Sequence, residues 1–219
     1  MKARLISFLI IGALALIGAA SANAGDIALG APVTIVSGGS LISNPGTPPS
    51  VVTDGVFAPE DTPYHSATGV ADAVEWSADY SGNTSVASGL VLDINLGAEY
   101  IITGAMVQAD DNDYYILQYW DSTSSSWQLL YDVPNISEGY GLRTRPDADQ
   151  TTYAPVGPVE TDMLQFSAIS GDSGDAVSEI QVEGTPVSSA VPEPSSLLLL
   201  GSGLAGLVGL VRRKVALRG

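Results

Sequence analysis

Short stretches of alternating apolar and polar residues occupy the centre of the chain. In residues 90–96 every second position is leucine or isoleucine, and Asp93 and Asn95 are among the residues between them. Residues 100–109 are rich in apolar and β-branched side chains, as a buried strand would be. A period of two residues indicates β-strands. We expect further strands at residues 114–120, 127–131, 163–169 and 177–182.

The predicted strand at residues 114–120 is aromatic on both faces. Tyr114, Ile116 and Trp120 share one face. The opposite face carries Tyr115, Leu117 and Tyr119. Because large apolar side chains are expected to avoid water, this pattern predicts that both faces of the strand are covered.

No long stretch of residues 25–190 keeps the apolar period of a helix. Turn residues separate the strands at residues 110–113, 122–126 and 171–175. Short strands at regular spacing, with no helices between them, are typical of a β-sandwich or jelly roll. We therefore expect an all-β fold, a single jelly-roll β-sandwich.

Residues 1–24 have the three parts of a secretory signal peptide. Lys2 and Arg4 precede an uncharged apolar stretch, and Ala22 and Ala24 form the small-x-small pattern for cleavage after Ala24. The alternative is an uncleaved membrane anchor. Export of the chain follows from the first interpretation.

The C-terminal residues carry a second apolar segment. Residues 185–190 are typical of a linker. The uncharged run at 195–211 predicts a transmembrane helix of about 25 Å, the short limit for a bilayer. Arg212, Arg213 and Lys214 follow it, and the positive-inside rule keeps them cytoplasmic. The domain would then lie outside the cytoplasm.

Three elements in order at 191–219 resemble the PEP-CTERM sorting signal. They are Val191-Pro192-Glu193-Pro194, the apolar helix and the arginine-rich end. The resemblance implies export through the inner membrane of a Gram-negative bacterium and processing by an exosortase. It also implies a place at the cell surface or in an extracellular matrix rich in polysaccharide. A permanent single-pass anchor is the alternative.

Charge narrows the possible partners of the central domain. Residues 25–190 contain 23 carboxylates and two cations, Arg143 and Arg145. Nucleic-acid binding is excluded, since affinity for phosphates comes mainly from Lys and Arg. The chain has no cysteine, which excludes disulfides, thiolate metal sites and a cysteine nucleophile.

Several short motifs resemble those of a discoidin-type, galactose-binding-like domain, which would occupy residues 25–184. They are VVTDGVF, VEWSA, Asn95-Leu96-Gly97, Tyr114 to Ile116, Trp127 and Ser178-Glu179-Ile180. The resemblance implies an eight-stranded jelly roll whose loops at one end bind glycans, lipid head groups or proteins. It also implies a structural Ca²⁺ ion held by Asp54 and Glu179. The loop at 54–62 offers Thr62 as a candidate further ligand. Without calcium, the same residues would be a capped turn and an exposed strand glutamate.

Arg143, Arg145 and Tyr140 are the candidate ligand contacts. A guanidinium fork could bind glycan hydroxyls or carboxylates, and Tyr140 could offer an aromatic face to a sugar. The alternative is internal ion pairing of the arginines and a core position for the tyrosine. The acidic turn at 110–113 is expected to be solvated. No catalytic residues are predicted, because His65 lacks the setting of a catalytic base.

These patterns predict an exported, non-catalytic protein that binds or resides in extracellular polysaccharide. A domain this acidic repels anionic polymers, so the glycan is expected to be neutral, or anionic and bridged by Ca²⁺. A structural acidic matrix component without a defined ligand is the alternative. A polysaccharide hydrolase, which would need a pair of carboxylates, is a third class.

Overall fold

The described part of the chain is an antiparallel β structure. The computed structural model describes residues 25–37, 40–41, 47–63, 73–77, 89–136, 139, 141–172 and 174–187. These contain one short 3-10 helix, η1 (Pro49–Thr53), and ten strands. The strands are β1 (Gly25–Asp26), β2 (Val33–Ser37), β3 (Ser40–Leu41), β4 (Val74–Ser77), β5 (Val91–Asp110), β6 (Tyr114–Asp121), β7 (Ser126–Val133), β8 (Leu142–Arg145), β9 (Ala154–Ser170) and β10 (Gly174–Pro186). The predicted all-β sandwich is confirmed.

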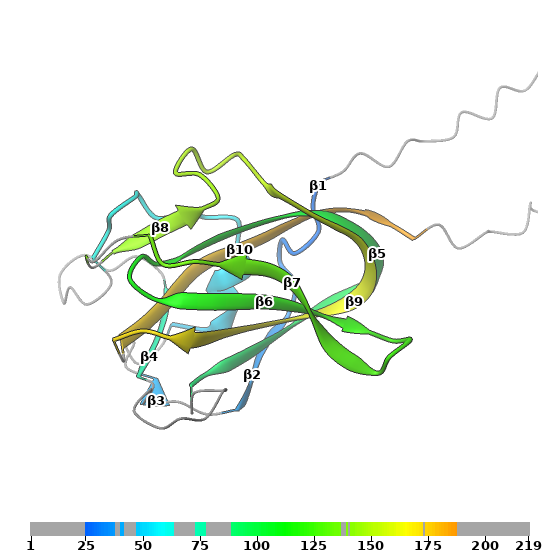
Figure 1. Cartoon of the computed structure of the whole chain (residues 1–219), viewed down its shortest axis with the longest axis horizontal. Coiled ribbons are helices and arrows are strands. Elements are labelled where there is room, and N and C mark those ends of the chain that lie inside the picture. Colours follow the sequence, from blue (N-terminus) through cyan, green and yellow to red (C-terminus); the bar gives the residue numbers. More distant parts are fainter. Residues whose placement is uncertain are drawn as a thin grey trace, which may run out of the picture.

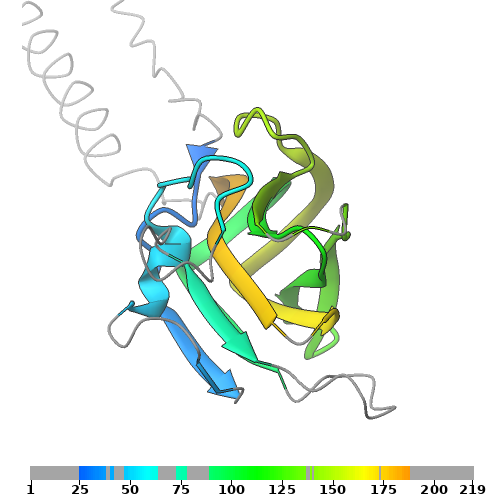
Figure 2. The same ribbon diagram turned by 90° about the vertical axis from the view of Figure 1, so that its left-hand side faces the viewer.

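Two long strands fold one hydrogen-bonded sheet into two layers. The first half of β5 pairs with β2 and with the second half of β9, which continues to β6 and β7. The second half of β5 pairs with β8 and β10, and β10 continues to β4 and β3. Figure 1 shows β6 and β7 at the front of the molecule, and Figure 2 shows the two layers from the side. We call the layer with β6 and β7 the front layer.

A bend in β5 carries it from one layer to the other. Its register with β9 breaks between Asn95 and Tyr100. Gly97 lies in this break with a φ of +77°, which glycine adopts without steric cost. The Asn95 side chain accepts a hydrogen bond from the Gly97 main-chain nitrogen at 2.8 Å. The strands expected at 90–96 and 100–109 are therefore halves of one strand.

The core lies between the layers. Tyr115 of β6 stacks on Phe166 of β9, with 5.3 Å between ring centroids. Trp76 of β4 meets Tyr115 edge-on at 6.2 Å, and all three side chains are fully buried. These rings join the two layers, because β4 belongs to the back layer and β6 to the front.

The prediction that both faces of residues 114–120 are covered is wrong. Tyr115 and Leu117 of β6 have no exposed surface. Tyr114, Ile116 and Trp120 on the other face are partly exposed. The physical reason is the two-layer architecture: the back layer covers only the inward face of the front one.

The ends of the described domain lie side by side, since Gly25 of β1 pairs with Gly184 of β10. Thr185 and Pro186, expected in the linker, are the last residues of β10. The predicted signal peptide, the sorting signal and the helix at 195–211 lie outside the described residues. Within the described ranges, no helix is long and apolar enough to cross a membrane.

Candidate functional site

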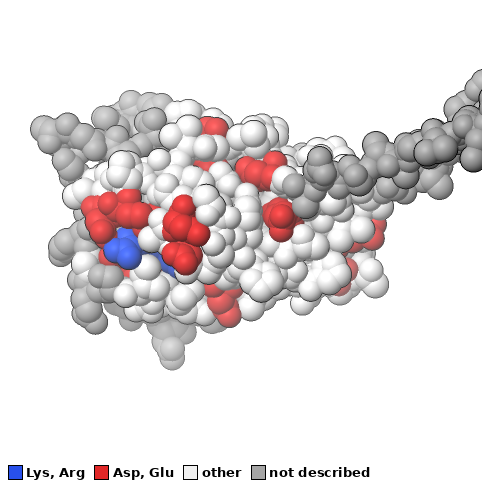
Figure 3. All heavy atoms as spheres, turned by 90° about the horizontal axis from the view of Figure 1, so that it is seen from above, with Lys and Arg blue, Asp and Glu red and all other residues white. Residues whose placement is uncertain are grey.

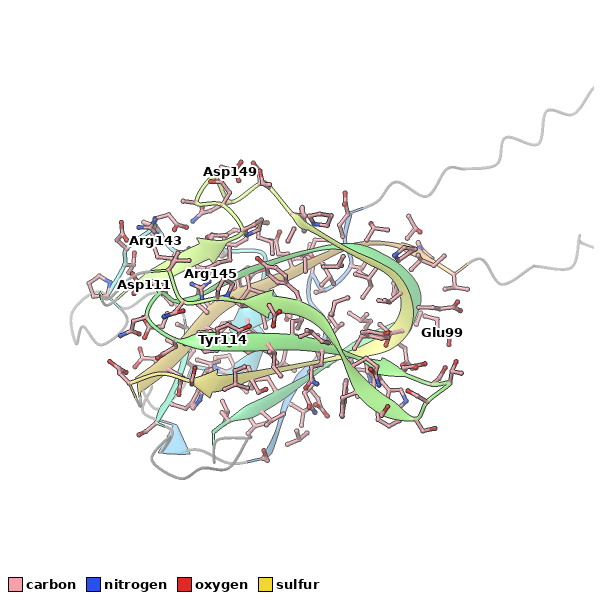
Figure 4. The ribbon with its side chains drawn as sticks, viewed as in Figure 1. Glu99, Asp111, Tyr114, Arg143, Arg145 and Asp149 are labelled. Carbon is pink, nitrogen blue, oxygen red and sulfur yellow. The ribbon has the colours of Figure 1, made fainter. Side chains whose placement is uncertain are left out.

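Most of the predicted site residues come from loops that meet at one end of the sandwich. Residues 54–62 reach the start of β8 through an antiparallel bridge between Thr62 and Leu142. The turn at 110–113 contacts the turn before β10, because the Asp172 main-chain nitrogen donates to Asp113 at 3.1 Å. We call this region the loop end. Figure 4 shows Asp111, Arg143 and Arg145 there, with Glu99 at the opposite end.

Two side chains that were not predicted hold the long loop at 54–62 in place. Gln108 of β5 is fully buried; its amide accepts from the Ala58 nitrogen at 2.8 Å and donates to the Ala58 oxygen at 2.9 Å. The Glu60 carboxylate accepts from the Thr144 hydroxyl at 2.6 Å and from the Gln150 amide at 2.9 Å. A glutamine within an apolar strand was the signal that could have pointed to this role.

Arg143 is paired inside the domain. Its Nε lies 3.3 Å from Glu60 Oε2, and one terminal nitrogen lies 2.6 Å from Asp61 Oδ1. The side chain is 32% exposed, so it is partly accessible to solvent. Figure 3 shows the cations of the described residues beside acidic side chains. These contacts are the internal ion pairing that was the alternative to a ligand role. Of the two arginines in the described residues, Arg143 is the one that reaches the surface.

Arg145 is a structural residue. It is buried, and its guanidinium donates to the main-chain oxygens of Ala109 at 2.8 Å and Asp110 at 3.0 Å. A third bond goes to the Arg143 oxygen at 2.9 Å, and the Tyr115 ring lies 5.9 Å away. A guanidinium with these contacts cannot reach a ligand at the surface. The predicted ligand role of Arg145 is therefore wrong. The side chain instead links β8 to β5 through hydrogen bonds to main-chain carbonyls.

The remaining predicted contact, Tyr140, lies outside the described residues, as does His65. The predicted ligand group of three residues is therefore described at two positions only. Of these two, Arg143 alone reaches the surface.

Two of the predicted metal ligands lie close together. Glu179 is fully buried in β10, and its two carboxylate oxygens accept from the Gly55 nitrogen at 3.1 and 3.3 Å. Asp54 precedes that glycine, and its carboxylate accepts from the Val56 nitrogen at 2.9 Å. Burial raises the pKa of Glu179 to about 8, and the carboxylates of Asp26 and Asp54 add to the rise. The metal-free alternative predicted that Glu179 would be exposed on the last strand. Its burial in β10 shows that this prediction is wrong.

Thr62 has other partners. Its hydroxyl donates to the Pro59 oxygen at 2.5 Å, and its main chain pairs with Leu142 of β8. The residues that lengthen this loop, Ala58 to Asp61, are the ones attached to Gln108 and Arg143. Within the described residues, no three Asp, Glu, His or Cys side chains group as metal ligands.

The acidic turn at 110–113 is not solvated as predicted. Asp110 and Asp113 have no exposed surface, and Asp175 of β10 is equally buried. The Tyr115 hydroxyl donates to Asp113 Oδ2 at 3.1 Å and accepts from the Ala176 nitrogen at 3.2 Å. Burial raises the pKa of Asp113 to about 8, with further contributions from the carboxylates of Asp175 and Asp110. Burial beside two other carboxylates therefore favours the protonated form of Asp113.

The C-terminal residues match a known family model. Residues 190–214 match the PEP-CTERM protein-sorting motif. The predicted sorting signal is confirmed. The match covers the end of the chain and leaves the β domain outside it, and no protein with a curated description matches the chain.

Solved structures similar to this chain include carbohydrate-binding modules. One is CpGH89CBM32-4 of Clostridium perfringens, in complex with GlcNAc-α-1,4-galactose: identity is 16%, coverage 75% of this chain and 96% of that one, and TM-score 0.43. Another is a fucose-binding module of Streptococcus pneumoniae, SpX-3, at 12% identity, with coverage of 72% and 96% and a TM-score of 0.45. SpGH29 matches at 16% identity and a TM-score of 0.43 over 74% of this chain, which spans only 28% of SpGH29. Likenesses this distant say nothing about a ligand here.

The two arginines should differ sharply in their contribution to stability. We expect Arg145→Met to lower the free energy of unfolding by about 2–4 kcal/mol, because buried carbonyls lose their donors. The matched variant Arg143→Met breaks a partly exposed ion pair and should cost no more than about 1 kcal/mol. Urea denaturation of the full-length protein measures both values. Equal losses would contradict the assigned roles.

Stability should fall as pH rises from about 4 to about 8. Over this range folded Asp113 keeps the proton that the unfolded chain, with its ordinary pKa of 3.8, releases. Unfolding then releases this proton, so Asp113 alone lowers the free energy of unfolding by up to about 1.4 kcal/mol per pH unit. Buried Glu179, whose pKa is also raised to about 8, adds to the decline in the same direction. Urea denaturation of the full-length protein across this pH range measures the slope.

Asp113→Asn should make the pH dependence shallower. The control is Asp149→Asn, because hydrogen bonds led by that from the Thr152 hydroxyl lower the pKa of Asp149 to about 2. That carboxylate is charged in both the folded and unfolded states above about pH 5, so its loss should leave the slope unchanged from there to about pH 8. An unaltered slope in Asp113→Asn would contradict a protonated Asp113.

Proposed function

We propose that this chain is an exported, non-catalytic carbohydrate-binding protein of the cell surface or extracellular matrix. The observation that carries the proposal is the match of residues 190–214 to the PEP-CTERM protein-sorting motif. A sorting motif after a single β-sandwich is what a delivered binding module requires. The resemblance of the strand motifs to discoidin-type domains supports the same class.

Processing by an exosortase is part of this proposal. The enzyme would act near Val191-Pro192-Glu193-Pro194, after the signal peptide has delivered the chain through the inner membrane. The described domain ends at Val187, whose nitrogen donates to the Glu99 oxygen at 3.0 Å. Cleavage near Val191 would therefore leave the folded domain intact.

The charge of the domain supports a neutral glycan as ligand. Arg143 is partly neutralised by Glu60 and Asp61, and Arg145 is buried. An anionic polymer would therefore meet carboxylates with little cationic charge to offset them. The second candidate, an acidic matrix component without a defined ligand, is favoured by the same internal pairing, because it leaves few loop-end groups free to bind.

We also propose a structural calcium ion at Asp54 and Glu179. The support is a buried glutamate beside a second carboxylate, an arrangement that a divalent cation would stabilise. Loop carbonyl oxygens would have to complete the coordination, with Thr62 as the third predicted ligand. Binding would displace the proton that Glu179 otherwise retains.

Calcium should raise the melting temperature of the full-length protein. At saturation we expect about 5–10 °C relative to chelator, because the ion binds only the folded state. Glu179→Gln should abolish the shift, whereas Glu99→Gln, which alters a carboxylate at the opposite end of the domain, should retain it. No shift in the unaltered protein would overturn the calcium proposal and leave the sorting proposal standing.

Processing can be tested by intact mass. Protein recovered from cell surface and medium should begin at Gly25 and end near Val191. Replacement of Pro192, Glu193 and Pro194 by alanine should retain Gly219, while Arg143→Met should be processed normally. An unaltered protein that keeps Gly219 would instead be a permanently anchored one.

A further inference from the structure

The outward face of the front layer carries two tryptophans side by side. Trp120 of β6 and Trp127 of β7 are direct cross-strand partners. Their ring centroids lie 5.4 Å apart, with 71° between the ring planes. Both side chains are partly exposed, and Leu129, two residues beyond Trp127 on β7, is 52% exposed. The pair therefore forms an apolar corner at the surface, with the two rings steeply inclined to each other.

Polar side chains extend this surface across the neighbouring strands. Gln118 of β6 pairs with Gln165 of β9, and Gln165 pairs with Asp93 of β5. The Gln165 amide donates to Asp93 Oδ1 at 2.8 Å, which orients the amide on the surface. In the adjacent row, Asn95 of β5 pairs with Met163 of β9. We call these residues the tryptophan face: Asp93, Asn95, Gln118, Trp120, Trp127, Leu129, Met163 and Gln165.

The alternation of the strands places this set outward. Leu117 and Leu164, which precede Gln118 and Gln165, are fully buried in the core. All eight side chains of the tryptophan face are at least partly exposed. Figure 1 shows β6 and β7 at the front of the molecule.

We propose that the tryptophan face binds a neutral polysaccharide chain that crosses strands β7, β6, β9 and β5. A sugar ring has a face of C–H bonds that packs on an indole, and hydroxyls at its rim that exchange hydrogen bonds with amides. The tryptophan face supplies both kinds of group. This inference takes its ligand class, a carbohydrate, from the proposed function. It places the binding on a surface away from the loop end.

Charge and size favour this occupant. The face has no cation, and its single carboxylate, on Asp93, disfavours phosphorylated or uronic chains. Adjacent strands lie about 4.8 Å apart, so the paired row of Leu129, Gln118, Gln165 and Asp93 spans about 14 Å. That length accommodates several linked sugars better than one, which indicates an internal stretch of a polymer.

The chain's own fluorescence can report binding. Of its three tryptophans, Trp76 is fully buried and the other two lie on this face. Hexasaccharides of neutral glucan, xylan and galactan, with an alginate oligosaccharide as the anionic comparison, are added to the full-length protein. Because the full-length protein carries the apolar segment at 195–211, it is kept in a detergent. The detergent must lack a sugar head group, which would compete with the probes. We expect a saturable emission change and protection from acrylamide quenching with at least one neutral probe, and neither with alginate.

Variants assign the binding to the face. Affinity electrophoresis should show that the double variant Trp120→Ala/Trp127→Ala binds at least about tenfold more weakly, because the aromatic stacking contact is lost. Trp127→Phe, which keeps a ring, should bind better than Trp127→Ala. Leu29→Ala removes an exposed apolar side chain elsewhere and should bind as the unaltered protein does. Quenching protection in the unaltered protein needs no variant, so the proposal stays testable if the double variant fails to fold.

Three results would overturn the inference in distinguishable ways. Undiminished binding by the folded double variant would show that the tryptophan face is not the binding site, and would leave the proposed function intact. A normally processed protein that binds no neutral probe would remove both the face and the carbohydrate-binding part of the proposed function. A dimer that the double variant converts to a monomer would show that the face instead contacts a second copy of this chain.

Discussion

The passage of β5 through both layers is the constraint on which the rest of the structure depends. This one strand of 20 residues pairs with β2, β8, β9 and β10, so its register sets that of the sheet. Its first half presents Asp93 and Asn95 on the tryptophan face. Its second half ends at the loop end, where Gln108 and Asp110 meet the loops. The loop end and the tryptophan face are therefore both consequences of one bent strand.

A domain with 23 carboxylates and two arginines must limit the cost of burying charge. Arg145 is used within the fold, where it saturates carbonyls of β5. Asp113 avoids the cost by keeping its proton, and Glu60 is fully engaged with Thr144, Gln150 and Arg143. The polar groups of the loop end are thus largely occupied with one another, whereas the tryptophan face presents partly exposed indoles and amides.

Regular alternation made β6, β7 and β10 predictable from sequence. It failed for β8, which has only four residues, and for the first half of β9, where Pro155, Gly157 and Pro158 hide the pattern. Resemblance brought Asp54 and Glu179 to one place, but the longer loop gave Thr62 and Glu60 partners on β8. Alternation identifies which side chains share a face. Whether a second layer covers that face is decided by tertiary packing, and so the burial of 110–113 and the exposure of Trp120 could not be predicted.

The most direct test of this account is the indole N–H spectrum of the ¹⁵N-labelled full-length protein during titration with a neutral hexasaccharide. Three tryptophans give three indole resonances. We predict that two of them, from Trp120 and Trp127, shift together and saturate, while that of buried Trp76 stays in place. Unmoved indole signals together with shifts of the Arg143 side chain would contradict the account and place the glycan at the loop end.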